Sequence, residues 1–292
     1  MSKFDDLFKQ YNCNLNDITV QEEVAKIIQE NFSNNDNKEV YEQCLSFIDL
    51  TSLNSTDTDA EIIAMVKKVN EFKTNFPQLP NVAAICVYPS LIPIVKEQLT
   101  ENVGIASVSA GFPASQTFIE IKVAETAMAV LEGASEIDVV LPIGKFLEGK
   151  FQDIYEELSE IKATCRHAHL KVILETGALL SSSNIKKASI LAMASGADFI
   201  KTSTGKMPVA ATLEATFVMC EAIKEWQEAT GEKVGFKAAG GIVSAQDAVK
   251  YYSVVKDVLG QDWLNKSLFR IGASRLANNL ISSIVQKDVK WF

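Results

Sequence analysis

Two matching stretches decide the fold that this sequence predicts: Gly133-Ala134-Ser135-Glu136-Ile137-Asp138 and Gly196-Ala197-Asp198-Phe199-Ile200-Lys201. Each stretch begins with a glycine that closes a helical segment and then runs into a short apolar strand. Asp138 and Lys201 therefore occupy the same phase of their strands. Such a repeat is typical of successive strand and helix units in one parallel sheet.

Outward from this repeat, the whole sequence alternates between short apolar runs and segments of helical period. Eight runs are predicted as strands: residues 44–50, 82–88, 104–110, 136–141, 170–175, 198–203, 233–238 and 267–272. Helix start signals lie between them, namely Thr58 with Glu61, Pro93 in a first turn, and Ser244 with Asp247. Strict alternation with apolar strands predicts an α/β protein with a parallel sheet covered by helices. Eight units, without a Gly-x-Gly-x-x-Gly after the first strand, favour a closed (β/α)8 TIM barrel over an open doubly wound sheet.

Residues 1–43 are predicted to form an N-terminal helical extension, and residues 44–292 the barrel domain. The extension is polar apart from one amphipathic helix, in which Thr19 and Glu22 are expected to form a capping box. Its apolar face comprises Val20, Val24, Ile27 and Ile28. Because such a face must pack on something, we expect this helix to close the bottom of the barrel, with partner binding as the alternative.

The composition of the 292-residue chain limits its partners. A net charge of -9 and a pI near 4.9 argue against nucleic acid or an acidic membrane surface, whereas a local pocket can still bind a small phosphorylated ligand. Without a bilayer-spanning apolar run or a signal peptide, the sequence predicts a cytoplasmic protein. A homo-oligomer remains open.

The cysteines and histidines predict neither a disulfide framework nor a metal site. The five cysteines are widely spaced and form no Cys-x-x-Cys pair, so we interpret them as reduced thiols: Cys13, Cys44, Cys86, Cys165 and Cys220. For Cys86, reaction with aldehydes is the alternative to a buried core thiol. His167 and His169 lack ligand partners at metal spacing and are placed in a helix-to-strand loop. No metal and no cofactor is therefore expected.

Four predicted strands carry a charged residue inside an apolar run: Asp49, Asp138, Lys201 and Lys237. Burying an ion without compensation costs several kcal/mol, so each charge must face outward, be paired or be functional. Alternate strands of a barrel supply the same interior layer, so Asp138 and Lys201 should point inward at similar height. The four charges sum to zero, and two structural salt bridges at the barrel mouth are therefore an alternative interpretation.

The residue types favour Schiff-base chemistry. A lysine attacks a carbonyl only when unprotonated, and at the reference pKa of ~10.4 only about one in 2,500 is neutral at pH 7. Burial and a second cation both lower that pKa, and Lys237 on the adjacent strand can be the second cation for Lys201. Asp138 is then placed to relay protons to and from the Schiff-base carbon, while Asp49 helps to hold the network. The predicted catalytic residues are Lys201, Asp138, Lys237 and Asp49.

Glycines at three successive strand ends predict a phosphate site. Glycine lets the backbone approach an anion closely, and the N–H groups of a helix start attract it. Barrels often hold a phosphate in the loops after strands seven and eight, where two of these segments fall. The predicted phosphate- and substrate-binding residues are Thr204, Gly205, Lys206, Gly240, Gly241, Gly272 and Ser274.

Seven segments of the chain, in order, resemble those of the deoxyribose-phosphate aldolases, and of the eukaryotic-type members in particular. The resemblance runs from about Phe47 to Leu276. Its segments are Ile48-Asp49-Leu50-Thr51, Ala84-Ile85-Cys86-Val87-Tyr88-Pro89, Glu136-Ile137-Asp138-Val139-Val140, Glu175-Thr176-Gly177, Phe199-Ile200-Lys201-Thr202-Ser203-Thr204-Gly205-Lys206, Gly235-Phe236-Lys237 and Phe269-Arg270-Ile271-Gly272-Ala273-Ser274.

The resemblance implies a class I aldolase that reversibly cleaves 2-deoxy-D-ribose 5-phosphate to acetaldehyde and D-glyceraldehyde 3-phosphate. It implies that Lys201 forms the Schiff base, that Asp138 and Lys237 assist proton transfer, and that no metal is needed because the protonated imine is the electron sink. The implied partners are thus a phosphorylated sugar and aldehydes. Two positions depart from the family: Ala238 replaces a usual proline and is expected to loosen its loop, and Arg275 replaces a usual serine or threonine. Arg275 either strengthens phosphate binding or faces solvent.

Two other functions stay open at this point. A Schiff-base aldolase of the transaldolase type would prefer a ketose donor. A catalytically inactive barrel that binds a phosphorylated metabolite as a scaffold would be stabilised by phosphate without turnover.

Overall fold

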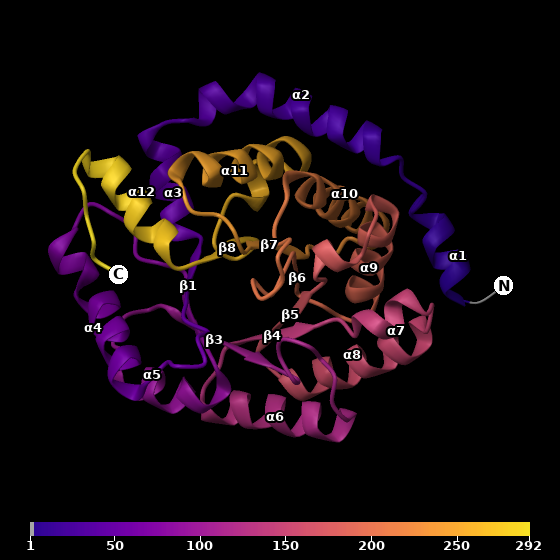
Figure 1. Ribbon diagram of the computed structural model, residues 1–292, viewed down its shortest axis with the longest axis horizontal. Coiled ribbons are helices and arrows are strands. Elements are labelled where there is room, and N and C mark those ends of the chain that lie inside the picture. The colour runs from indigo at the N-terminus through magenta and orange to yellow at the C-terminus, as the bar shows by residue number, and fades with distance from the viewer. Residues whose placement is uncertain (1–2) are drawn as a thin grey trace.

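The computed structural model describes residues 3–292, within which eight parallel strands close into a barrel (Figure 1). The strands pair in chain order, and β8 closes on β1. Their bounds are β1 Ile48–Thr51, β2 Ala84–Val87, β3 Gly104–Ser109, β4 Glu136–Val140, β5 His169–Ile173, β6 Phe199–Lys201, β7 Gly235–Ala239 and β8 Phe269–Ala273. The predicted (β/α)8 TIM barrel is confirmed.

Helices follow the strands and form a ring outside the barrel (Figure 1). They are α4 Asp59–Asn75, α5 Ile92–Gln98, α6 Ile119–Glu132, α7 Ile143–Leu147, α8 Phe151–Cys165, α9 Ser182–Ala194, α10 Leu213–Thr230, α11 Ala245–Leu259 and α12 Arg275–Val285, with short 3-10 helices η1 Pro89–Leu91, η2 Thr176–Ala178 and η3 Gln261–Trp263. The predicted capping boxes at the starts of α4 and α11 both form, and a proline lies in the first turn of α5. No helix within residues 3–292 has the length and apolar content needed to cross a membrane.

The region before the barrel contains more helix than the sequence predicted. Residues 3–46 form three helices, α1 Lys3–Gln10, α2 Asp17–Asn35 and α3 Lys38–Ser46. The predicted Thr19–Glu22 capping box is wrong, because the Asn16 side chain accepts the first N–H groups and α2 begins at Asp17. The first predicted strand also began too early, since α3 extends to Ser46. A short apolar run does not distinguish the buried end of a helix from a strand.

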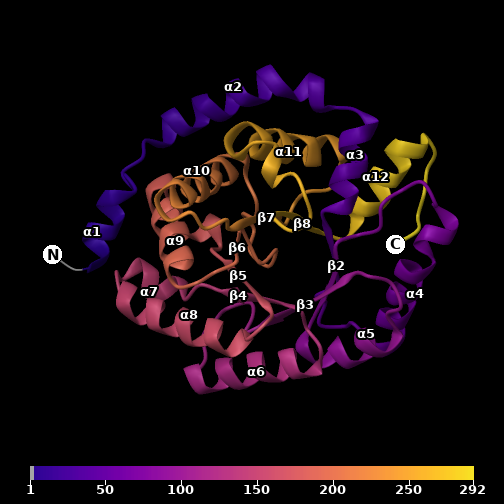
Figure 2. The ribbon, with the colours of Figure 1, turned by 180° about the vertical axis from the view of Figure 1, so that it is seen from behind.

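The position of α2 differs from the expected one at the bottom of the barrel. Both ribbon views place it on the outer rim, alongside α10 and α11 (Figures 1 and 2). Three of its four predicted apolar residues are buried there: Val20, Val24 and Ile27. At its end, buried Asn35 donates to Ser253 Oγ at 3.0 Å and accepts from Lys256 Nζ at 3.0 Å. The helix packs there because the ring helices offer a surface that matches its apolar face.

The barrel interior divides into an apolar part and a charged part. The apolar part lies beside β2 and β3 and comprises Leu53, Ala84, Cys86, Ala106 and Val108. Cys86 is fully buried, and this burial raises its pKa, in agreement with a core thiol. Around the rest of the interior, the inward positions of β1 and β4–β8 carry ionisable side chains. The main hydrophobic core lies outside, between the strands and the ring of helices.

Gly235 provides a test of interior packing. It pairs with Phe199 across β6 and β7, and a Cβ atom at position 235 would lie only 2.3 Å from the Phe199 ring. We expect Gly235→Ala to lower the free energy of unfolding by about 1–3 kcal/mol through overpacking, measured by urea denaturation. Adding Phe199→Leu should recover part of this loss. An unchanged midpoint for the single variant would contradict the packing described.

Candidate active site

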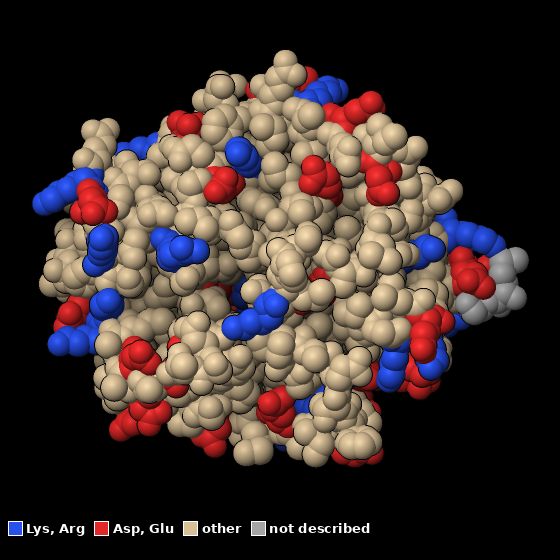
Figure 3. Space-filling view, viewed as in Figure 1, with Lys and Arg blue, Asp and Glu red and all other residues tan. Residues whose placement is uncertain are grey.

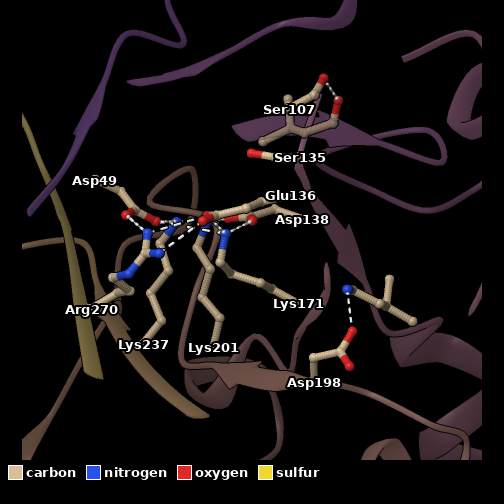
Figure 4. Close-up of polar contacts among 12 residues, drawn as sticks. Asp49, Ser107, Ser135, Glu136, Asp138, Lys171, Asp198, Lys201, Lys237 and Arg270 are labelled. Atoms are coloured by element: carbon tan, nitrogen blue, oxygen red, sulfur yellow. Dashed lines mark hydrogen bonds and ion pairs between the residues drawn. The ribbon is translucent and has the colours of Figure 1, made fainter. Parts of the chain in front are cut away.

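Seven buried charged side chains from six strands meet inside the barrel (Figure 4). They are Asp49, Glu136, Asp138, Lys171, Lys201, Lys237 and Arg270. With all groups ionised, the four basic side chains exceed the three carboxylates by one positive charge. This cluster therefore favours the loss of one proton from one of its basic groups.

Sequence reasoning found four of these groups and missed Glu136, Lys171 and Arg270. The predicted balance of two positive and two negative charges was therefore incomplete. The sequence contains the same signal for two of the missed residues, a charged residue inside an apolar run. Lys171 lies between Leu170 and Val172, and Arg270 lies between two apolar residues of β8.

Arg270 and Lys171 neutralise the carboxylates nearest the amino ends of the strands. Arg270 donates to Glu136 Oε1 at 2.7 Å and to Asp49 Oδ1 at 2.6 Å. Lys171 donates to Glu136 and, at 3.2 Å, to Asp138 Oδ1. These contacts are buried ion pairs that compensate the charges of Arg270 and Lys171.

Lys201 and Lys237 share one carboxylate oxygen. Both Nζ atoms lie 2.8 Å from Asp138 Oδ2, which confirms that Asp138 and Lys201 point inward at the same height. Lys237 also lies 2.5 Å from Asp49 Oδ2, whereas no second carboxylate among residues 3–292 pairs with Lys201. Lys201 is thus the less compensated of two adjacent cations.

This difference separates the pKa values of the two lysines. Burial lowers the pKa of Lys201; Asp138 opposes this effect and Lys237 reinforces it, so the pKa is lowered overall. Burial also acts on Lys237, but Asp138 and Asp49 outweigh it and its pKa is raised. Burial would raise the pKa of Asp138, yet the lysines around it hold that pKa well below its usual range. Lys201 is therefore the amine that loses its proton more easily, beside an ionised carboxylate.

A cavity of about 320 Å³ opens at the carboxyl ends of the strands, with Lys201 in its lining. All seven residues predicted to bind phosphate and substrate line this cavity. The other three predicted catalytic residues, Asp49, Asp138 and Lys237, are not among its lining residues. Asp138 contacts both Lys201 and Lys237, and Lys237 contacts Asp49. Among the described lining residues, the charged ones are Lys201, Lys206 and Arg275, all basic. Figure 3 shows charges of both signs scattered over the rim of the molecule and a basic side chain near the centre of the face.

The glycines around the cavity allow close backbone approach. Gly240 has a φ of +88°, and a Cβ atom there would lie 2.6 Å from Ala210 Cβ and 3.3 Å from the Gly205 Cα. At Gly272, a Cβ atom would lie 3.1 Å from Lys237 Cε. Gly272 therefore leaves room for the side chain of Lys237, a function that sequence reasoning did not foresee.

The two positions that depart from the family pattern lie in different environments. Arg275 is exposed, begins α12 and lines the cavity. Ala238 is buried within β7, and the next residue, Ala239, donates its N–H to the hydroxyl of Thr202 at 3.0 Å. Nothing in this arrangement supports the expected loosening of the loop.

The histidines and the last residues of the chain lie away from the cavity. His169 begins β5, not a loop, and the described residues contain no group of three or more His, Cys, Asp or Glu side chains placed to hold a metal ion. Phe292 stacks on Phe72 of α4 at a ring distance of 5.3 Å, and Trp291 donates to the Lys68 carbonyl at 3.0 Å. These contacts hold the last two residues in the outer helical layer.

Known proteins are similar to this chain in sequence and in fold. A family model described as DeoC/LacD family aldolase matches residues 44–258. The deoxyribose-phosphate aldolase of Homo sapiens is 42% identical over 249 residues, covering 82% of this chain and 78% of the human protein. The mouse enzyme is 41% identical over the same length. A tetrameric deoxyribose phosphate aldolase from Aeropyrum pernix matches with a TM-score of 0.67 at 25% identity, over 88% of this chain and 96% of its own.

The unequal compensation of the two lysines predicts a pH effect. Lys237→Met removes a cation that lowers the pKa of Lys201 and leaves Asp138 to stabilise protonated Lys201 more strongly. Because an amine attacks a carbonyl only in its neutral form, we expect the midpoint of imine formation with acetaldehyde to move to higher pH, measured by borohydride trapping at Lys201. Lys122→Met, at a buried lysine that pairs with Glu157 outside the barrel, is the control and should leave the midpoint in place. An unchanged or lower midpoint in Lys237→Met would contradict the electrostatic assignment.

Proposed function

The chain belongs to the DeoC/LacD aldolase family, and from this premise we propose that it reversibly cleaves 2-deoxy-D-ribose 5-phosphate to acetaldehyde and D-glyceraldehyde 3-phosphate. The observation that carries the proposal is the buried amine of Lys201, with its lowered pKa, 2.8 Å from Asp138 at a cavity whose described charged residues are all basic. A nucleophilic amine beside a proton carrier suits an aldehyde, and a cationic mouth suits a phosphate.

In the proposed reaction, neutral Lys201 attacks the C1 aldehyde of the open-chain sugar and expels water to form a protonated imine. The C3 hydroxyl then loses its proton, and the C2–C3 bond breaks. The bonding electrons move into the imine and leave an enamine on Lys201, while C3 becomes the aldehyde of D-glyceraldehyde 3-phosphate. Protonation of the enamine at C2 and hydrolysis of the imine release acetaldehyde and restore the amine.

We assign proton transfer to Asp138, assisted by Lys237, on the basis of their shared contact. Asp138 is the carboxylate nearest Lys201, and its low pKa means that it donates only a proton that it has just received. Lys237 stays protonated and contacts Asp138 Oδ2, whereas Lys171 contacts Oδ1. Asp49 keeps Lys237 in this position through its own contact at 2.5 Å.

The phosphate is proposed to bind at the mouth, between the loops that follow β6, β7 and β8. The loops there carry glycines, at which no side chain shields the backbone, and the start of α12 adds the favourable end of a helix dipole. Lys206 and Arg275 supply positive charge. This placement directs the aldehyde end of the sugar toward Lys201.

Trapping of the intermediate tests the reaction. Borohydride reduction with acetaldehyde should leave an ethyl group on Lys201, located by mass spectrometry of peptides. Lys201→Ala should reduce turnover by several orders of magnitude without altering the circular dichroism spectrum. Modification of a different lysine, or full activity of this variant, would falsify the assignment. Preference for a ketose donor would indicate a transaldolase-type enzyme, and phosphate binding without turnover would indicate a scaffold.

Arg275 gives a separate test of the phosphate site. We expect Arg275→Ala to raise the KM for the phosphorylated sugar by about threefold to tenfold, since it removes a charge-assisted contact at an exposed position. The KM for unphosphorylated 2-deoxy-D-ribose should not change. Lys287→Ala removes an exposed cation just beyond the other end of α12 and serves as the control. Equal KM values for wild type and Arg275→Ala would place this side chain in solvent.

A further inference from the structure

Glu175 is a buried carboxylate that the proposed reaction does not use. It follows β5, is only 3% exposed, and has a left-handed backbone with a φ of +51°. A residue other than glycine keeps this conformation only where its surroundings fix it. The described residues include no cation that forms an ion pair with Glu175. The burial of the Glu175 carboxylate therefore requires an explanation other than an ion pair.

The carboxylate of Glu175 binds one residue of the cavity wall. It accepts the backbone N–H of Thr204 at 3.2 Å and the hydroxyl of Thr204 at 2.5 Å. The Thr204 hydroxyl oxygen in turn accepts the N–H of Lys206 at 3.0 Å. Three consecutive residues of the wall, Thr204 to Lys206, are thus held from below by one side chain.

The turn that carries Glu175 also contacts the far part of the same loop. A Cβ atom at Gly177 would lie 2.3 Å from the carbonyl oxygen of Val209, so only glycine permits this approach. Lys206 Nζ also donates to the carbonyl of Leu53, another residue that lines the cavity. The loop after β6 is therefore fixed near its start, near Val209 and by the contact with Leu53.

We propose that Glu175 is a positioning residue that sets the geometry of the phosphate-binding segment from Thr204 to Lys206. The proposal rests on the proposed function of the cavity. The two Thr204 donors bind different oxygens of the Glu175 carboxylate, so an amide in the same place would present its own N–H groups to one of them. The negative charge by itself would weaken phosphate binding, so positioning and simple electrostatics predict opposite effects of its removal.

The test compares kcat/KM for 2-deoxy-D-ribose 5-phosphate and for 2-deoxy-D-ribose in wild type, Glu175→Gln and Glu175→Ala. The ratio of the two values measures the preference for phosphate. In Glu175→Ala we expect this ratio to fall by about tenfold to a hundredfold, mainly through KM for the phosphorylated sugar. In Glu175→Gln the ratio should fall less, because glutamine keeps the shape of the side chain and one acceptor oxygen. Trapping of acetaldehyde on Lys201 should persist in both variants.

Glu157→Gln is the matched control, because Glu157 is a buried carboxylate that binds Lys122 and Lys145 in the outer layer. It should leave the phosphate preference unchanged even if stability falls. Equal losses for both sugars in the Glu175 variants, or a preserved or higher ratio, would overturn the proposal.

Failure of the proposed function would be seen separately, as a wild-type protein that cleaves neither sugar. Inorganic phosphate then becomes the probe. The positioning role requires thermal stabilisation of wild type by phosphate that is lost in Glu175→Ala. Equal stabilisation of both proteins would reject the role of Glu175.

Discussion

The contact on which the site depends is the sharing of one oxygen of Asp138 by two ammonium groups, each at 2.8 Å. One carboxylate cannot compensate two cations fully, and of these two lysines only Lys237 also pairs with Asp49. The shortage of negative charge therefore falls on Lys201, whose pKa is lowered while that of Lys237 is raised. Chemically identical side chains acquire different properties because one has a second partner.

The rest of the interior maintains this inequality. Arg270 and Lys171 pair with Glu136, and they also contact Asp49 Oδ1 and Asp138 Oδ1. Within residues 3–292, Lys201 therefore has Asp138 Oδ2 as its one ion-pair partner. Gly272 leaves space for the chain of Lys237. An apolar cluster beside β2 and β3 fills the remaining interior and adds to the desolvation of the amines. A network that resembles a set of structural salt bridges thus also lowers the pKa of one of its own lysines.

The cavity wall is organised by backbone geometry as much as by charge. Gly205 and Gly240 bring the loops after β6 and β7 together, and Glu175 holds the first of these loops from beneath. The outer layer carries the remaining parts of the chain: α2 lies on α10 and α11, and the last two residues pack at α4 (Figure 2). Rigid strands and short hydrogen-bonded loops hold the cavity residues in fixed relative positions.

The sequence by itself determined the barrel, the order of its strands and the inward direction of Asp138 and Lys201, because strand periodicity and the repeated segment are local patterns. It also identified the glycine-rich strand ends that line the cavity. It did not determine the start of β1, the place of α2 or the roles of Glu136, Lys171, Arg270 and Glu175. These depend on which side chains meet across strands distant in the chain. Only the closed barrel decided which lysine received a second carboxylate, because electrostatic compensation depends on distance in space and not on separation in sequence.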